Sequence, residues 1–273
     1  MNDTSSRIAF IGGGNMASAI IGGLVRQGMA PSRIAVVEPF GDARARLAQQ
    51  FGVQAEEQAS ASLASASLVV WAVKPQTFRD AAAQAKPHVR QALHLSVAAG
   101  IRSDSIAAWV GTERIVRSMP NTPALVGKGM TALYARSAVS DADKARVEQV
   151  IATTGEHLWV AQEKDLDAVT ALSGSGPAYV FYFLEAMTQA GSEMGLPSDQ
   201  ARRLAIGTFA GASELARASD EPLQTLRERV TSKGGTTYAA LTSMEQDQVK
   251  AAFVKALHAA CRRAGELGDE FGK

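Results

Sequence analysis

The sequence lacks most features of secreted, membrane-bound or nucleic-acid-binding proteins. Its single cysteine, Cys261, excludes a disulfide within the chain and fits a reducing compartment. No stretch approaches the roughly 20 consecutive apolar residues that span a bilayer, and the first residues lack the pattern of a secretory signal. The net charge of +1 gives no electrostatic reason to expect nucleic acid or a membrane surface as a partner. These absences predict a soluble, cytoplasmic protein.

Strong catalytic groups are also scarce. The histidines are scattered without metal-ligand spacing, so no metal site is predicted: His88, His94, His157 and His258. S-G-S-G-P at 173–177 is not a nucleophile elbow, because neither serine has glycine two residues before and two residues after it. A phosphate-binding GxxxxGK[ST] motif is missing as well. The chain therefore offers no strong acid, base or metal site.

The residues that are present indicate two halves of different architecture. With 46% hydrophobic and 20% charged residues in 273, the chain has the composition of a globular protein with one large or two ordinary domains. Short apolar, β-branched runs predict strands at 7–11, 34–37, 67–73, 92–97 and 114–119. Helical stretches such as 15–27 separate them, and Ser140 and Asp143 form a capping pair for a later helix. This alternation predicts a Rossmann-type, doubly wound α/β domain over residues 1–160.

After residues 157–160 the strand signals cease. Helices are expected at 163–172, 177–194, 198–218, 222–230, 237–246 and 248–268. The segment 178–184, A-Y-V-F-Y-F-L, is apolar nearly all round, so it requires burial within a large domain or against another subunit. Gly207 and Gly211, one turn apart, would allow a close approach of helices. An all-helical domain over residues 161–273 is predicted.

A glycine-rich turn follows the first predicted strand. I-G-G-G-N-M-A places Gly12, Gly14 and Ala17 at the positions of the G-x-G-x-x-G/A fingerprint, between a strand and a helix. The N–H groups of the helix start would face a dinucleotide pyrophosphate. The turn predicts these cofactor-binding residues: Ile11, Gly12, Gly13, Gly14, Asn15 and Met16.

The ends of other strands add to this expected site. Glu38 ends the second strand and can accept hydrogen bonds from a ribose diol, which favours NAD over NADP. Arg44 and Arg46 follow and could meet a 2′-phosphate if Glu38 turned away, so the choice between NAD(H) and NADP(H) stays open. The small residues of A-V-K-P and S-V-A-A-G would let the dinucleotide lie against the backbone at Ala72, Val73, Lys74, Pro75, Val97, Ala98 and Ala99. Lys74 could instead be a solvated charge. M-P-N-T-P at 119–123 is a rigid turn at the same edge, which Asn121 braces.

The stretch T-S-K-G-G-T-T at 231–237 interrupts the helical half. Either the glycines end one helix and Thr236 or Thr237 caps the next, or the turn presents free N–H groups to an anion. A dinucleotide site without a strong acid suits reduction of an imine, because a protonated C=N bond is already electrophilic.

Together these motifs resemble one family, pyrroline-5-carboxylate reductase. The resemblance rests on six motifs that occur in the family's order and cover nearly the whole chain. They are residues 10–17, 72–75, 96–100 and 119–123, A-L-S-G-S-G-P-A-Y at 171–179, and V-T-S-K-G-G-T-T at 230–237. It implies a Rossmann domain followed by an all-α dimerisation domain that forms an interlocked dimer, often assembled into a decamer of five dimers. It also implies reduction of 1-pyrroline-5-carboxylate to L-proline by NAD(P)H, between the helical domains of two subunits.

The resemblance implies roles for particular residues. The substrate carboxylate would bind the turn formed by Ser232, Gly234, Gly235 and Thr236, and the Thr237 hydroxyl would donate a hydrogen bond to the ring nitrogen. Glu163 matches an acid near the substrate amine. This chain departs from the family pattern at Ala59-Ser60, where Asn is common, and at Lys233, where Pro is common.

Two rival hypotheses predict different residues. A β-hydroxyacid dehydrogenase shares the glycine turn and a helical second domain but needs a lysine shortly after its S-G-x-G stretch. This chain has no lysine between Asp165 and Ser232, which counts against that class. A non-catalytic dinucleotide sensor would have no need for the S-x-G-G-x-T turn.

Overall fold

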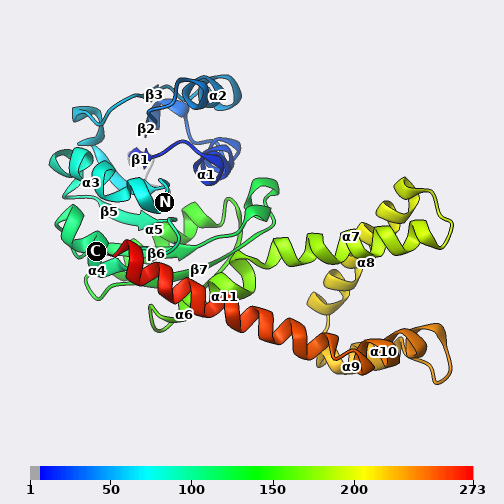
Figure 1. The fold of residues 1–273 in the computed structure, drawn as a ribbon. Coiled ribbons are helices and arrows are strands. Elements are labelled where there is room, and N and C mark those ends of the chain that lie inside the picture. Colours follow the sequence, from blue (N-terminus) through cyan, green and yellow to red (C-terminus); the bar gives the residue numbers. More distant parts are fainter. Residues whose placement is uncertain (1–6, 273) are drawn as a thin grey trace. The chain divides into compact units, whose positions relative to one another are not determined.

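The computed structural model describes residues 7–272, and its first unit is built on an eight-stranded sheet (Figure 1). The strand order is β3-β2-β1-β4-β5-β6-β7-β8, and every neighbouring pair is parallel except β6 and β7. The strands are β1 Arg7–Ile11, β2 Ile34–Val37, β3 Ala55–Glu56, β4 Ala66–Trp71, β5 Leu93–Ser96, β6 Ile115–Met119, β7 Gly129–Ala135 and β8 Gly155–Trp159.

Helices cover both faces of this sheet. They are α1 Asn15–Arg26, α2 Gly41–Phe51, α3 Pro75–Val89, α4 Ser103–Val110, α5 Asp141–Ile151 and α6 Asp165–Val169, and a π-helical turn, Thr170–Gly174, follows α6. Short 3-10 turns lie at Pro31–Arg33, Ala61–Leu63 and Thr122–Val126.

The core of the first unit forms two layers, one on each face of the sheet. On one face, Ile8 and Phe10 of β1 belong to a cluster of buried residues that includes apolar residues of α1, α2 and α5. On the other, Ala9 and Ile11 belong to a cluster that includes residues of α3 and α4. Successive strand residues point to opposite faces, so a strand covered on both faces is a continuous apolar run. This explains why β1, β2 and β4 were recognisable in the sequence.

The sheet differs from the prediction at β7. The antiparallel strand Gly129–Ala135 was not expected, nor was the two-residue strand β3. Beyond β6 the 3-10 turn Thr122–Val126 reverses the chain, so β7 returns along β6 in place of a helical crossover. The expected capping pair is confirmed: Ser140 and Asp143 bond each other's backbone N–H groups at the start of α5.

The second compact unit, Gly176–Ala259, is helical, while the residues from Ala260 onward belong with those up to Ser175 in the first. Its helices are α7 Gly176–Glu193, α8 Ser198–Arg217, α9 Leu223–Arg229, α10 Thr236–Gln246 and the first part of α11 Val249–Phe271. Each lies within three residues of its predicted bounds. The helix predicted at 163–172 consists of the short α6 and the π-helical turn instead. The domain boundary near residue 160 stays a prediction.

Much of the apolar surface of α7 is exposed in the single chain. Tyr179 and Phe183 contact Phe253 edge to face, with ring centroids 5.6 Å apart in both pairs. Phe181 and Tyr182, however, are 59% and 69% exposed. The burial expected for residues 178–184 is therefore not provided within this unit. Across residues 7–272, no helix has the length and apolar character needed to cross a lipid bilayer.

Candidate functional site

Three consecutive glycines shape the turn after β1. Gly12 has a φ of +99°, and a Cβ atom there would lie 2.5 Å from the Ala72 carbonyl oxygen, so a larger residue does not fit. Gly14 is the N-cap of α1, and a Cβ atom there would point into open space. Within the described residues no side chain caps this helix. The turn thus presents the N–H groups of a helix start, an arrangement that binds phosphate groups.

Glu38 follows β2 and points to the glycine turn. Its Oε2 accepts a hydrogen bond from the Gly13 N–H at 2.7 Å, and its Oε1 accepts one from the Phe40 N–H at 2.9 Å. A Cβ atom on Gly13 would lie 3.2 Å from the Glu38 side chain and 2.7 Å from Leu47. The middle glycine therefore leaves room for Glu38, a role that the fingerprint alone does not predict.

A cavity of about 790 Å³ opens at the carboxyl ends of β1, β2 and β4. Its size is within the range of small-molecule and cofactor sites. The predicted cofactor residues that line it are Ile11, Gly12, Gly14, Glu38, Ala72, Val73 and Lys74. Those that do not are Gly13, Asn15, Met16, Pro75, Val97, Ala98 and Ala99. The cavity, the glycine turn and the open helix start together fit a dinucleotide.

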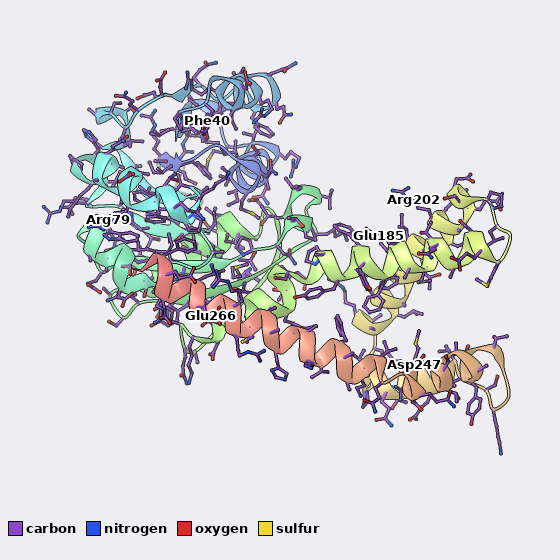
Figure 2. All side chains as sticks on the ribbon, viewed as in Figure 1. Phe40, Arg79, Glu185, Arg202, Asp247 and Glu266 are labelled. Atoms are coloured by element: carbon purple, nitrogen blue, oxygen red, sulfur yellow. The ribbon has the colours of Figure 1, made fainter. Side chains whose placement is uncertain are left out.

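Sequence reasoning missed the wall of the cavity formed by α2 and α3. The additional lining residues include Phe40, Asp42 and Ala43 near the start of α2 and Thr77, Asp80, Ala81, Gln84 and Ala85 on α3. Figure 2 shows Phe40 at the connection between β2 and α2. The α3 positions recur every three or four residues and share one helix face, which is the signal that was available. Only the sheet order reveals that this face borders the cavity.

The S-V-A-A-G segment continues from β5 alongside the end of β4. The Val97 N–H donates to the Trp71 carbonyl at 3.0 Å, and the buried Ala98 donates its N–H to the Ser96 hydroxyl at 3.3 Å. This segment and A-V-K-P therefore lie at the same edge of the sheet, although S-V-A-A-G does not line the cavity.

Asn121 connects two motifs that are distant in the sequence. Its Nδ2 donates to the Ser173 carbonyl at 3.1 Å, and its Oδ1 accepts a hydrogen bond from the Met130 N–H at 2.9 Å. Ser173 belongs to the π-helical turn Thr170–Gly174, a form that is frequent at functional sites. Asn121 thus braces both M-P-N-T-P and the S-G-S-G stretch, and the second contact was not expected.

The Glu163 carboxylate is bonded to residues of the first unit. Its Oε1 accepts hydrogen bonds from the Ser103 N–H at 2.6 Å and from Arg117 at 2.7 Å, and its Oε2 accepts one from the Ser103 hydroxyl at 2.6 Å. Arg117 is buried, so this carboxylate neutralises a buried guanidinium. Burial also raises the pKa of nearby Asp167, although the charges of Arg117 and Arg102 oppose that shift.

The S-K-G-G-T-T turn lies at the start of α10. Gly234 has a φ of +74°, and the Gly235 N–H donates to the Ser232 carbonyl at 3.0 Å. Gly235 is the N-cap, so neither Thr236 nor Thr237 caps the helix as the structural alternative expected. No side chain among the described residues caps α10 either. Ser232 lies beside the N-cap, with its Oγ 2.8 Å from where a Gly235 Cβ atom would stand. The turn therefore presents backbone donors, glycines and hydroxyls together.

The fold and the cavity define the class: an NAD(P)-dependent oxidoreductase with a Rossmann-type domain and a helical second unit. Residues 163–267 match the family model described as pyrroline-5-carboxylate reductase dimerisation, and residues 7–100 match that described as NADP oxidoreductase coenzyme F420-dependent. Pyrroline-5-carboxylate reductase of Pseudomonas aeruginosa is 42% identical over 272 residues, which cover 99% of this chain and 100% of the relative. The chain therefore belongs to the pyrroline-5-carboxylate reductase family.

Solved structures agree with this assignment. A pyrroline-5-carboxylate reductase from Coxiella burnetii has a TM-score of 0.88 at 37% identity and covers 96% of this chain and 98% of its own. The pyrroline carboxylate reductase of Plasmodium falciparum with NADP bound has a TM-score of 0.87 at 29% identity, covering 97% and 99%. The family, the fold class and the use of NAD(P)H are thus confirmed. The dimerisation match also shows that the protein is a homo-oligomer.

Proposed function

We propose that this protein reduces 1-pyrroline-5-carboxylate to L-proline with NAD(P)H, the final step of proline biosynthesis. The observation that carries the proposal is an uncapped S-K-G-G-T-T turn at the start of α10 in a chain that also has a dinucleotide cavity. When bound, NAD(P)H supplies a hydride to the imine carbon. The electron pair of the C=N bond then goes to the protonated nitrogen, which becomes a neutral amine.

The turn is proposed to bind the substrate carboxylate. Helix N-termini attract anions through their N–H groups and the helix dipole, and glycine lets a ligand approach the backbone closely. Gly234 and Gly235 provide that access, the Ser232 hydroxyl is a further donor, and the Thr236 N–H belongs to the first turn of α10.

Thr237 is proposed to donate a hydrogen bond to the ring nitrogen. It is the second residue of α10 and is half-buried, so a ligand at the helix start lies within reach of its hydroxyl. A protonated imine needs positioning more than a strong acid, so a hydroxyl is sufficient.

Glu163 is proposed, from the resemblance, to lie near the substrate amine. The bonds of its carboxylate to Ser103 and Arg117 support a second role, which is to neutralise a buried guanidinium and to hold the start of α4.

The oligomer is proposed to be a homodimer, and the further assembly that the resemblance implies is a decamer of five dimers. Phe181 and Tyr182 on α7 expose apolar area that a second subunit would cover. In α8, Cβ atoms on Gly207 and Gly211 would meet nothing within 4 Å, so this surface is free for a second helix to approach closely. A cytoplasmic location and a domain boundary near residue 160 stay predictions from the sequence and are part of this proposal.

The proposed reaction is tested by following the loss of nicotinamide absorbance with 1-pyrroline-5-carboxylate, with NADH and NADPH in parallel. Turnover is expected with at least one of them. A folded sample that binds the cofactor but turns over with neither would contradict the proposal and favour the non-catalytic sensor.

A further inference from the structure

The position of Glu38 bears on which nicotinamide cofactor the protein prefers. The Plasmodium falciparum relative binds NADP, so the fold alone does not exclude the phosphorylated cofactor. NADH and NADPH differ only at the 2′ position of the adenosine ribose, which is a hydroxyl in the first and a phosphate in the second. In a Rossmann-type domain the side chains that follow β2 lie near this 2′ position, so they determine the preference between NADH and NADPH.

Glu38 is held in place against the glycine turn. The residue is 5% exposed, and each carboxylate oxygen accepts a backbone N–H, from Gly13 and from Phe40. Turning the side chain away would break both bonds and leave the Gly13 N–H without its partner. Each carboxylate oxygen can accept a further hydrogen bond, so a ribose diol in the cavity finds a fixed acceptor.

Arg44 and Arg46, which the sequence analysis considered as partners of a 2′-phosphate, are poorly placed to bind one. Arg44 donates to the Glu38 and Pro39 carbonyls at 2.9 and 2.8 Å and pairs with Glu57 at 3.3 Å, so its guanidinium is already bonded. Arg46 does line the cavity, but Asp42, one helical turn earlier, lines it as well.

The charge of the cavity lining also disfavours NADPH. Apart from Glu57, which pairs with Arg44, its lining contains three carboxylates, Glu38, Asp42 and Asp80, against the two cations Arg46 and Lys74. A 2′-phosphate would bring a charge of about −1.5 to −2 into this acidic lining, close to a carboxylate that is held in place.

We infer that this protein selects NADH over NADPH and that Glu38 determines the selection, an inference that rests on the dinucleotide site of the proposed function. The ribose diol donates to the Glu38 carboxylate, and a 2′-phosphate loses these bonds and meets like charge.

The first test is a binding measurement on the full-length protein without substrate. Titration with NADH and with NADPH, followed by cofactor fluorescence, gives the two Kd values. NADH is expected to bind at least about tenfold more tightly, the scale set by lost hydrogen bonds to a charged group. Equal affinity, or tighter binding of NADPH, would overturn the inference.

Variants then test the role of Glu38. Glu38→Ser and Glu38→Gln should each weaken NADH binding and shift the ratio of the two Kd values toward NADPH by about tenfold. Glu38→Gln keeps the shape of the side chain and one oxygen acceptor, so this variant is expected to fold. Circular dichroism checks the folding of both variants. Asp104→Asn is the control, because it removes an exposed carboxylate of the same unit that does not line the cavity, and it should leave the ratio nearly unchanged.

The outcomes separate this inference from the proposed reaction. Preferential NADH binding without turnover of the imine would contradict the reaction and leave the inference intact. Folded Glu38 variants that keep the wild-type ratio would contradict the inference, even if the imine is reduced.

Discussion

At the scale of single residues, the proposed chemistry depends most on the Thr237 hydroxyl. Thr237→Ala should lower kcat while leaving the Kd of the cofactor nearly unchanged, because only the donor to the ring nitrogen is lost. The expected cost is about 1–3 kcal/mol in transition-state stabilisation. Steady-state kinetics together with cofactor titration measure both quantities, and Thr237→Ser, which keeps the hydroxyl, is the control. Unchanged kcat in Thr237→Ala would remove this residue from its role.

A substitution of Glu163 distinguishes a role in stabilising the fold from a role in binding the substrate. In Glu163→Gln the buried Arg117 loses its counterion, so the free energy of unfolding should fall by about 3 kcal/mol, the scale of a broken buried ion pair. Urea denaturation measures that change, and KM for the imine is determined on the same sample. A rise in KM with unchanged stability would mean that the carboxylate serves the substrate alone.

His94 makes stability depend on pH. Trp71 donates to its Nδ1 at 2.9 Å, so Nε2 carries the proton that bonds the Val89 carbonyl at 3.1 Å, and burial lowers the pKa of His94 to about 4. In the unfolded chain the imidazole has a pKa near 6.5, so it takes up the second proton, at Nδ1, more readily than the buried ring does. The stabilisation is therefore complete above about pH 6.5 and is lost as the pH falls toward 4, by about 3 kcal/mol.

Urea denaturation from pH 7 to pH 4 measures this dependence. His94→Gln should lack that part of the slope, whereas His258→Gln, at an exposed position on α11, should keep it. A His94 variant with the wild-type slope would assign the pH dependence to other groups.

At the scale of elements, the junction of β1, the glycine turn and α1 carries the clearest prediction. Gly14 has open space where a Cβ atom would point and a φ of −72°, so Gly14→Val should fold normally. Its side chain would occupy the space of the pyrophosphate, so the Kd of the cofactor should rise by about 100-fold or more. Ala30→Val, beyond the other end of α1, is the control in the same binding assay. Tight binding by folded Gly14→Val would place the cofactor elsewhere.

Elements whose signals are local were predictable. The continuous apolar runs of β1 and β2, and the Ser140–Asp143 capping pair of α5, depend on residues adjacent in the chain. β7 was missed because its residues, G-M-T-A-L-Y-A, form a strand by pairing with β6. The π-helical turn at Thr170–Gly174 was read as a continuous helix because its composition is that of one.

At the scale of the whole molecule, the exposed face of α7 predicts the assembly. Phe181→Glu should convert the oligomer to a smaller species, because a charge would be buried where an apolar ring is expected. Val126→Glu is the control, since Val126 is 77% exposed and lies outside residues 163–267. Sedimentation equilibrium measures the masses. A monomeric wild-type protein, or an unchanged mass in Phe181→Glu, would contradict this interface.

The sequence by itself determined the family, the α/β class, most of the helices and strands, and the glycine turn with its helix start. All of these depend on short patterns, in which neighbouring residues carry the whole signal. The tertiary structure decided where the side chains point: Glu38 to Gly13, Asn121 to Ser173, and Glu163 to Arg117. These contacts join residues 25 or more positions apart, and their geometry depends on the order of the strands, which short patterns do not specify.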